Sequence, residues 1–302
     1  MSISSSSAVS RLLPPATLAG LANLELVARA AVEGFLIGLH RSPRFGFSQE
    51  FKEYRAYVEG DDPRFVDWNV YARTERAYIR RYEGETNTRL MIVLDASASM
   101  SYASHAVSKL QYGKFLAAAL AYLASRQHDP AGLLVFDSAL RQYRPPTSRA
   151  GGLIGLLHAI DTVEVGGRTD LEASFQSMRE HLSRRGLVAV ISDLYCDADA
   201  LLRAVQPLAI HGQDIVLMHV LDPQELKPQW REAVMVQDSE TQERINVSGA
   251  YWRERYPERL AEHLAALRST AANVGAHYVQ IGSDEPLDRA LRRYLLFREG
   301  RN

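Results

Sequence analysis

The chain has 302 residues, of which 46% are hydrophobic and 24% are charged, as in an ordinary globular protein. Its 35 Lys and Arg residues nearly balance its 36 Asp and Glu residues, so the net charge does not favour binding to nucleic acid or to anionic lipid. The single cysteine, Cys196, excludes an internal disulfide framework. Together with a start that lacks the pattern of a secretory signal, it leads us to expect a cytoplasmic protein.

The N-terminal part differs in composition from the remainder of the chain. Residues 1–16 are rich in serine and predict disorder. Residues 18–39 are strongly apolar, but Glu25, Arg29 and Glu33 form a charged stripe at four-residue spacing. A membrane span needs about 20 residues with few charges. The stretch therefore predicts an amphipathic helix that packs on a domain.

From residue 88 onward, short apolar runs alternate with helical patterns. The runs predict strands buried on both faces at residues 90–94, 131–136, 187–192, 214–221 and 276–281. Apolar residues at helical spacing predict helices at residues 107–123, 151–160, 171–182, 198–208, 257–273 and 286–297. Two hairpins are expected, one that returns at residues 140–143 and one across residues 233–247. This order predicts an α/β domain over residues 88–300, with a mostly parallel central sheet flanked by helices on both faces.

Oxygen-bearing side chains follow the predicted strands, where open α/β sheets bind their ligands. Asp95, Ser97 and Ser99 come directly after the strand at 90–94, Thr169 follows a pair of glycines, and Asp193 ends the strand at 187–192. Each residue alone could be a helix cap or a turn residue. Five oxygen ligands from three loops are the donor set that a hard cation prefers, so we predict a site for Mg²⁺, with Mn²⁺ as the alternative.

This pattern resembles the metal-ion-dependent adhesion site of von Willebrand factor A domains: Asp-x-Ser-x-Ser after an apolar strand, a distant Thr, then Ser-Asp after another strand. The resemblance implies a von Willebrand factor A-like fold. It also implies that Ser97, Ser99 and Thr169 are hydroxyl ligands, while Asp95 and Asp193 act as carboxylate ligands, often through water. A cation held by so few carboxylates stays electron-poor, and it can then attract an acidic side chain of a protein partner.

Residues 17–87 comprise the N-terminal helix and a segment of charged and aromatic residues that we call the collar, residues 40–87. We expect the collar to be irregular, with extended backbone at 77–82, and to pack on the main domain. Its Gly-Asp-x-x-Arg-x-x-Asp-Trp sequence, with Tyr-x-Arg-Thr downstream, resembles the family catalogued as domain of unknown function 58. The residues singled out here are Arg64, Asp67, Trp68 and Arg73. They could form ion pairs around an apolar anchor or contact a partner. Many members of that family carry a pair of membrane helices near the start, and this chain is expected to be a soluble form without them.

Two functions remain open at this point. The resemblance implies a non-enzymatic interaction module that works with a MoxR-type AAA+ ATPase in chaperone-like assembly or activation of other proteins. The alternative is a metal-dependent hydrolase acting on phosphate esters, with Asp95 as nucleophile or with a metal-activated water. Hydrolases of that kind usually carry a positioned lysine and a second carboxylate two residues after the first. Position 97 is serine, so the sequence favours the interaction module.

Overall fold

The computed structural model describes residues 14–21, 23–40, 51–58, 66–82, 89–149 and 151–299. The chain divides into two compact units, one of residues 36–87 and one formed by the remainder. The disorder predicted for residues 1–16 falls almost entirely outside the described residues, although Pro15 already begins helix α1 (Pro15–Ala19). Arg64 of the collar also lies outside them.

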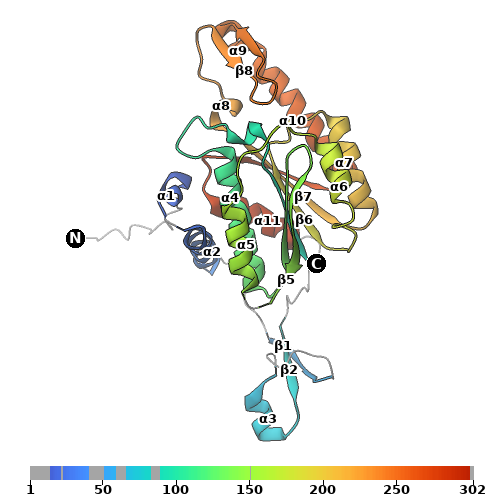
Figure 1. Cartoon of the computed structure of the whole chain (residues 1–302). Helices are drawn as coiled ribbons and strands as arrows, with labels where there is room; N and C mark the ends of the chain where they lie inside the picture. Colours follow the sequence, from blue (N-terminus) through green and yellow to red (C-terminus); the bar gives the residue numbers. More distant parts are fainter. Residues whose placement is uncertain are drawn as a thin grey trace, which may run out of the picture. The chain divides into compact units, whose positions relative to one another are not determined.

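The larger unit is built on a sheet of six strands in the order β10-β7-β6-β3-β4-β5 (Figure 1). In chain order the strands are β3 (Leu90–Asp95), β4 (Ala131–Phe136), β5 (Leu140–Thr147), β6 (Leu187–Ser192), β7 (Asp214–Leu221) and β10 (His277–Gly282). All neighbours pair in parallel except β5, which returns antiparallel to β4 at one edge. The predicted mostly parallel sheet and its hairpin edge are confirmed.

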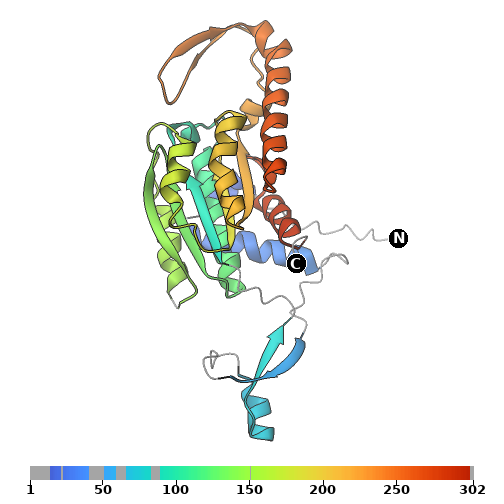
Figure 2. The same ribbon diagram turned by 90° about the vertical axis from the view of Figure 1, so that its right-hand side faces the viewer.

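Helices cover both faces of this sheet, as Figures 1 and 2 show. One face carries α4 (Lys109–Arg126), α5 (Gly152–Asp161) and α11 (Leu287–Glu299). The other face carries α6 (Leu171–Met178), α7 (Ala198–Ile210) and α10 (Tyr256–Asn273). Side chains alternate across a strand, so Met91 and Val93 join the buried cluster with α6, α7 and α10. Leu94 points the other way and lies against Gly113 of α4. Burial on both faces explains why the strands are continuous apolar runs.

The predicted amphipathic helix is α2 (Leu24–His40), whose residues up to Phe35 belong to the larger unit. Val27, Ala28 and Val32 are buried. On the opposite side, Arg29 Nε donates to Glu33 Oε1 at 3.0 Å, within the charged stripe that the sequence indicated. In the part of the chain that is described, no helix combines the length and the hydropathy that crossing a bilayer requires.

The smaller unit contains more regular structure than the collar sequence predicted. Strands β1 (Phe51–Ala56) and β2 (Tyr78–Tyr82) pair antiparallel, and helix α3 (Trp68–Thr74) lies between them in the chain. The extended backbone expected at 77–82 is strand β2. Strand β1 was missed because its charged side chains break the apolar pattern of a strand. The seven-residue helix α3 is too short to show helical periodicity.

The collar residues have different environments. Asp67 is buried and accepts a hydrogen bond at its Oδ1 from Val70 N at 3.2 Å, in the first turn of α3. Trp68 is 61% exposed and contacts Tyr71 edge to face, so its indole is not buried within the smaller unit. Arg73 lies in the exposed last turn of the helix.

A further hairpin follows the sheet strand β7 and the short helix α8 (Pro223–Leu226). It consists of β8 (Val234–Gln237) and β9 (Arg244–Val247), as predicted, and it leads into α9 (Gly249–Glu254) and α10. In Figure 2 the hairpin, drawn in orange, extends beyond the end of the central sheet. It lies near the carboxyl ends of the parallel strands, where the candidate site is located.

Candidate metal centre

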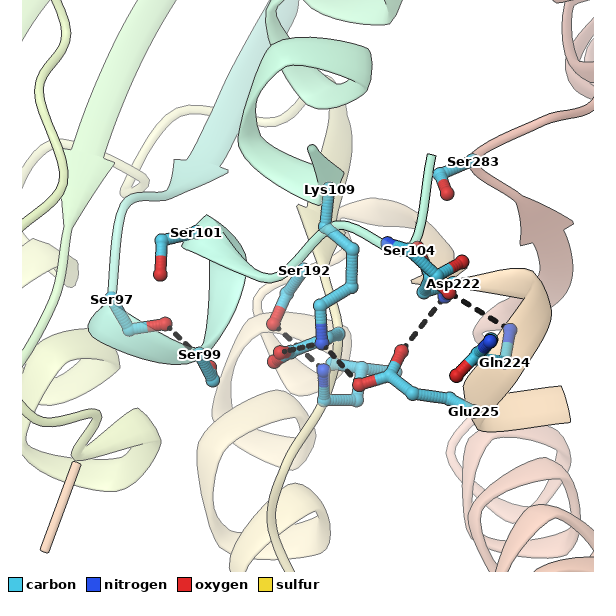
Figure 3. Close-up of polar contacts among 12 residues, drawn as sticks. Ser97, Ser99, Ser101, Ser104, Lys109, Ser192, Asp222, Gln224, Glu225 and Ser283 are labelled. Carbon is cyan, nitrogen blue, oxygen red and sulfur yellow. Dashed lines mark hydrogen bonds and ion pairs between the residues drawn. The ribbon is translucent and has the colours of Figure 1, made fainter. Parts of the chain in front are cut away.

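The first loop of the site follows β3 and carries Asp95, Ser97 and Ser99. Asp95 is fully buried, and its Oδ1 accepts a hydrogen bond from the backbone N–H of Ser97 at 2.9 Å. This bond closes a tight turn, after which the 3₁₀ helix η2 (Ala98–Ser101) begins. The Oγ atoms of Ser97 and Ser99 are 3.1 Å apart and hydrogen-bonded (Figure 3). This turn, residues 95–99, which we call the serine turn, therefore brings two hydroxyls close together.

The second loop, which carries Thr169, is fixed against the first by backbone hydrogen bonds. Gly166 N donates to Ala96 O at 2.6 Å, and Ala98 N donates to Gly167 O at 2.8 Å. A Cβ atom on Gly166 would lie 2.2 Å from Asp137 Oδ2, so a larger residue here would have to displace the Asp137 side chain. The loop of Thr169 consequently lies beside the serine turn.

The third loop begins where β6 ends and carries Asp193. Its neighbour Ser192 donates from Oγ to Asp95 Oδ2 at 2.6 Å, which links the first and third loops directly. Asp193 is itself buried. The structure thus brings together the loops of all five predicted residues, from positions up to 98 residues apart in the chain (Asp95 to Asp193). This convergence follows from the parallel pairing of β3 with β6, which places both carboxyl ends at one edge.

A buried lysine that sequence reasoning missed lies at the centre of the site. Lys109 Nζ is 2.8 Å from Asp193 Oδ2 and 2.6 Å from Glu225 Oε1, and its side chain is only 3% exposed. Figure 3 shows it between Ser192 and Glu225. Burial opposes its charge, but the carboxylates of Asp193 and Glu225 more than compensate and raise the pKa of Lys109 to about 12. The ammonium group therefore stays charged beside Asp193.

Glu225, the second partner of this lysine, is positioned by helix α8. Its Oε2 accepts a hydrogen bond from the backbone N–H of Asp222 at 2.7 Å, in a capping box at the start of the helix. Asp222 in turn accepts a bond at Oδ2 from Ser104 N at 2.8 Å, which ties α8 to the segment after the serine turn. Burial raises the pKa of Glu225, and the nearby ammonium of Lys109 opposes that shift.

The electrostatics of the two buried aspartates favour a further positive charge. Burial, followed by the negative charge of Asp193, raises the pKa of Asp95 to about 7, although hydrogen bonds from Ser192 and Ser97 oppose the shift. Asp193 Oδ1 is buried and has no hydrogen-bond partner among the described residues. A small cation near this oxygen would satisfy it and relieve the repulsion between the carboxylates.

The donor set fits a hard cation and does not fit a softer one. In the described part of the chain, no three His, Cys, Asp or Glu side chains group together as metal ligands. The available donors are hydroxyls and carboxylate oxygens, which Mg²⁺ accepts together with water. Ser97, Ser99, Thr169 and Asp193 would hold the ion. Asp95 would act through water, since both of its oxygens already accept hydrogen bonds from Ser97 and Ser192.

A cavity of about 410 Å³ opens beside the site, between the third loop and the β8–β9 hairpin. Ser99, Lys109 and Asp193 line its polar end. Aromatic side chains line much of the remainder: Tyr102, Tyr195, Trp230, Tyr251, Trp252 and Tyr256. Sequence reasoning did not find this cavity, because its walls come from segments that share no periodic pattern.

The lone cysteine, three residues after Asp193, is expected to react slowly. Burial, followed by the charges of Asp197 and Asp193, raises the pKa of the Cys196 thiol to about 12. Only the thiolate is nucleophilic. We predict that iodoacetamide alkylates Cys196 at pH 8 at least about a hundredfold more slowly than a free thiol of pKa about 8.5, with a rate still rising above pH 9. Intact-mass spectrometry measures the rate, and urea-unfolded protein is the control. A native rate equal to the unfolded rate would contradict the prediction.

The sequence and the fold were compared with known proteins. The family described as "Protein of unknown function DUF58" matches residues 53–266. The uncharacterized proteins Rv1480 of Mycobacterium tuberculosis and Mb1516 of Mycobacterium bovis are each 27% identical over 275 residues, which covers 89% of this chain and 86% of theirs.

Among solved structures, the conserved hypothetical protein BatB from Bacteroides thetaiotaomicron is similar, with a TM-score of 0.48 and 15% identity, over 70% of this chain and 99% of that one. The VWA domain of SpRpn10 has a TM-score of 0.40 and 15% identity, over 68% of this chain and 94% of that domain.

Proposed function

This chain belongs to the DUF58 family. Given this family and its von Willebrand factor A-like fold, we propose that the chain is a non-enzymatic protein-interaction module whose binding depends on a divalent cation. Mg²⁺ is the proposed ion and Mn²⁺ the alternative. The ion would be held by Ser97, Ser99, Thr169 and Asp193, and Asp95 would contact it through water. It would leave a coordination position for an acidic residue of the partner.

Two observations carry the proposal: Asp193 Oδ1 is buried without a hydrogen-bond partner among the described residues, and two serine hydroxyls converge on the loop after β3, of which Ser99 lines the same cavity as Asp193. A buried carboxylate oxygen without a partner is costly, and a bound cation supplies what it lacks. The aromatic cavity next to it offers a surface on which a protein segment could bury apolar side chains. A MoxR-type AAA+ ATPase is the proposed partner. The two proteins would act together in chaperone-like assembly or activation of other proteins, and any ATP chemistry would belong to the partner.

The test is a pull-down between this chain and a MoxR-type ATPase encoded by the same genome, with Mg²⁺ and with EDTA. We expect capture in Mg²⁺ and its loss in EDTA and in Asp95→Asn. The variant Asp199→Asn, an equal charge change on the exposed start of α7, should bind like the wild type. Capture that is equal with and without EDTA would reject the metal dependence. Absence of capture by the wild type would reject this class of partner.

The hydrolase alternative finds less support in the geometry. A nucleophilic Asp95 would need an oxygen aimed at substrate, but Oδ1 and Oδ2 accept hydrogen bonds from Ser97 and Ser192 within the fold. The residue is also fully buried. Turnover of a phosphomonoester or phosphodiester in the presence of Mg²⁺ or Mn²⁺, lost in Asp95→Asn, would favour this alternative over the interaction module.

A further inference from the structure

A carboxylate from elsewhere in the chain already contacts one of the proposed metal ligands. Glu240 lies at the turn of the β8–β9 hairpin, 71 residues from Thr169 in the chain. Its Oε1 accepts a hydrogen bond from Thr169 Oγ1 at 2.7 Å, and its Oε2 accepts one from Thr169 N at 3.0 Å. Its backbone carbonyl accepts a third bond from Arg168 Nε at 3.2 Å. The tip of the hairpin is therefore fastened to the loop of Thr169 by three hydrogen bonds.

The hairpin turn is constructed so that Glu240 is held in this position. Asp238 Oδ1 accepts hydrogen bonds from the backbone N–H groups of Glu240 at 2.7 Å and Thr241 at 2.9 Å. Backbone bonds from Asp238 N to Glu243 O and from Gln242 N to Asp238 O close the turn. Gln242 adopts a positive φ of 63°, a conformation that residues other than glycine seldom take. These hydrogen bonds leave the backbone at Glu240 little freedom to move, so the position of its side chain is restricted.

The body of the hairpin has little packing of its own to fix it. Its two strands pair over only four residues each, and Met235 and Ile245 are 64% and 62% exposed. An isolated two-stranded hairpin is marginally stable in water. Its inner side, including Val236 and Val247, lines the cavity that ends at Asp193. The contact between Glu240 and Thr169 thus closes the hairpin across that cavity.

We propose that the β8–β9 hairpin is a lid and that Glu240 is an internal ligand, which occupies the place of the partner's acidic residue until a partner displaces it. The inference rests on the proposed function, because it names the regulation of the same site. An internal carboxylate keeps the site closed to weak acidic ligands. It therefore restricts binding to partners whose acidic residue is accompanied by side chains that fill the aromatic cavity.

The test compares Glu240→Gln with Glu243→Gln in the full chain. Glu243 is on the same hairpin, lines the same cavity and is exposed, so its substitution removes the same charge without touching the contact to Thr169. Hydrogen exchange, measured without metal, should accelerate about tenfold at the hairpin and at Thr169 N–H in Glu240→Gln, because charge-assisted hydrogen bonds are replaced by weaker ones. Glu243→Gln should exchange like the wild type.

A second measurement places Glu240 relative to the cation. Binding of Mn²⁺ alone, followed by electron paramagnetic resonance, should weaken several-fold in Glu240→Gln and change little in Glu243→Gln. Equal exchange and equal Mn²⁺ affinity in the two variants would overturn the lid. Failure of the wild type to bind Mn²⁺ would instead overturn the proposed metal site, and the exchange data would still decide whether Glu240 holds the hairpin closed.

Discussion

Replacing Ser97 with alanine is expected to lower the affinity of the chain for Mn²⁺ by at least about tenfold, while leaving the fold intact. The Ser97 Oγ would be a direct ligand, and even groups outside the first layer of ligands change metal affinity about 10- to 100-fold. The backbone N–H of Ser97, which donates to Asp95, is unaffected by the substitution. Isothermal titration calorimetry measures the affinity, and circular dichroism checks the fold.

The serine turn supplies its own control for this experiment. Ser101 lies in the same 3₁₀ helix, but its Oγ donates to the backbone carbonyl of Ala98 at 2.7 Å and the residue is exposed. Ser101→Ala should therefore bind Mn²⁺ like the wild type. Thr169→Val, which removes a hydroxyl on a different loop, should reproduce the loss. If Ser97→Ala and Ser101→Ala bind equally well, the hydroxyls of the turn serve only the local backbone.

Much of the larger unit could be predicted because its strands are buried on both faces. Such strands are short apolar runs, and the helices between them have apolar residues at helical spacing. The same reasoning extended to Asp95 and Asp193, because parallel strands bring their carboxyl ends to one edge of the sheet. The same reasoning did not predict the secondary structure of the collar. Strand β1 has six residues and helix α3 has seven, and neither sequence shows a periodic apolar pattern.

The remainder of the site depends on contacts that sequence spacing cannot reveal. Lys109 pairs with Asp193 and Glu225 across 84 and 116 residues, and Glu240 reaches Thr169 across 71. One local signal was available for Lys109, which is the first residue of α4. The dipole of a helix disfavours a positive charge at this end, so a lysine there indicates a nearby carboxylate. The sequence could have suggested that Lys109 has an acidic partner, but only the fold identifies which one.

The second large effect concerns stability. Lys109→Met should lower the free energy of unfolding by about 3–5 kcal/mol in EDTA, since removing one member of a buried ion pair leaves the other charge uncompensated. The charge left behind is that of Asp193, whose side chain is 2% exposed. The folded protein raises the pKa of Lys109 from 10.5 to about 12, so this contribution is complete below pH 10.5 and is lost only as the pH rises through 12. At pH 7 the full effect should appear in urea unfolding followed by circular dichroism.

A matched lysine on the same helix separates this effect from the loss of any lysine. Lys114 lies five residues further along α4, is only half-buried, and donates to the Asp161 carbonyl at 3.0 Å. Lys114→Met should change the free energy of unfolding by less than about 1 kcal/mol. Mg²⁺ should restore part of the stability of Lys109→Met, because a cation beside Asp193 replaces the missing ammonium charge. Equal destabilisation by both substitutions would show that Asp193 does not depend on Lys109. A large loss in the free energy of unfolding that Mg²⁺ does not change would show that Lys109 stabilises the fold and that the cation does not bind beside Asp193.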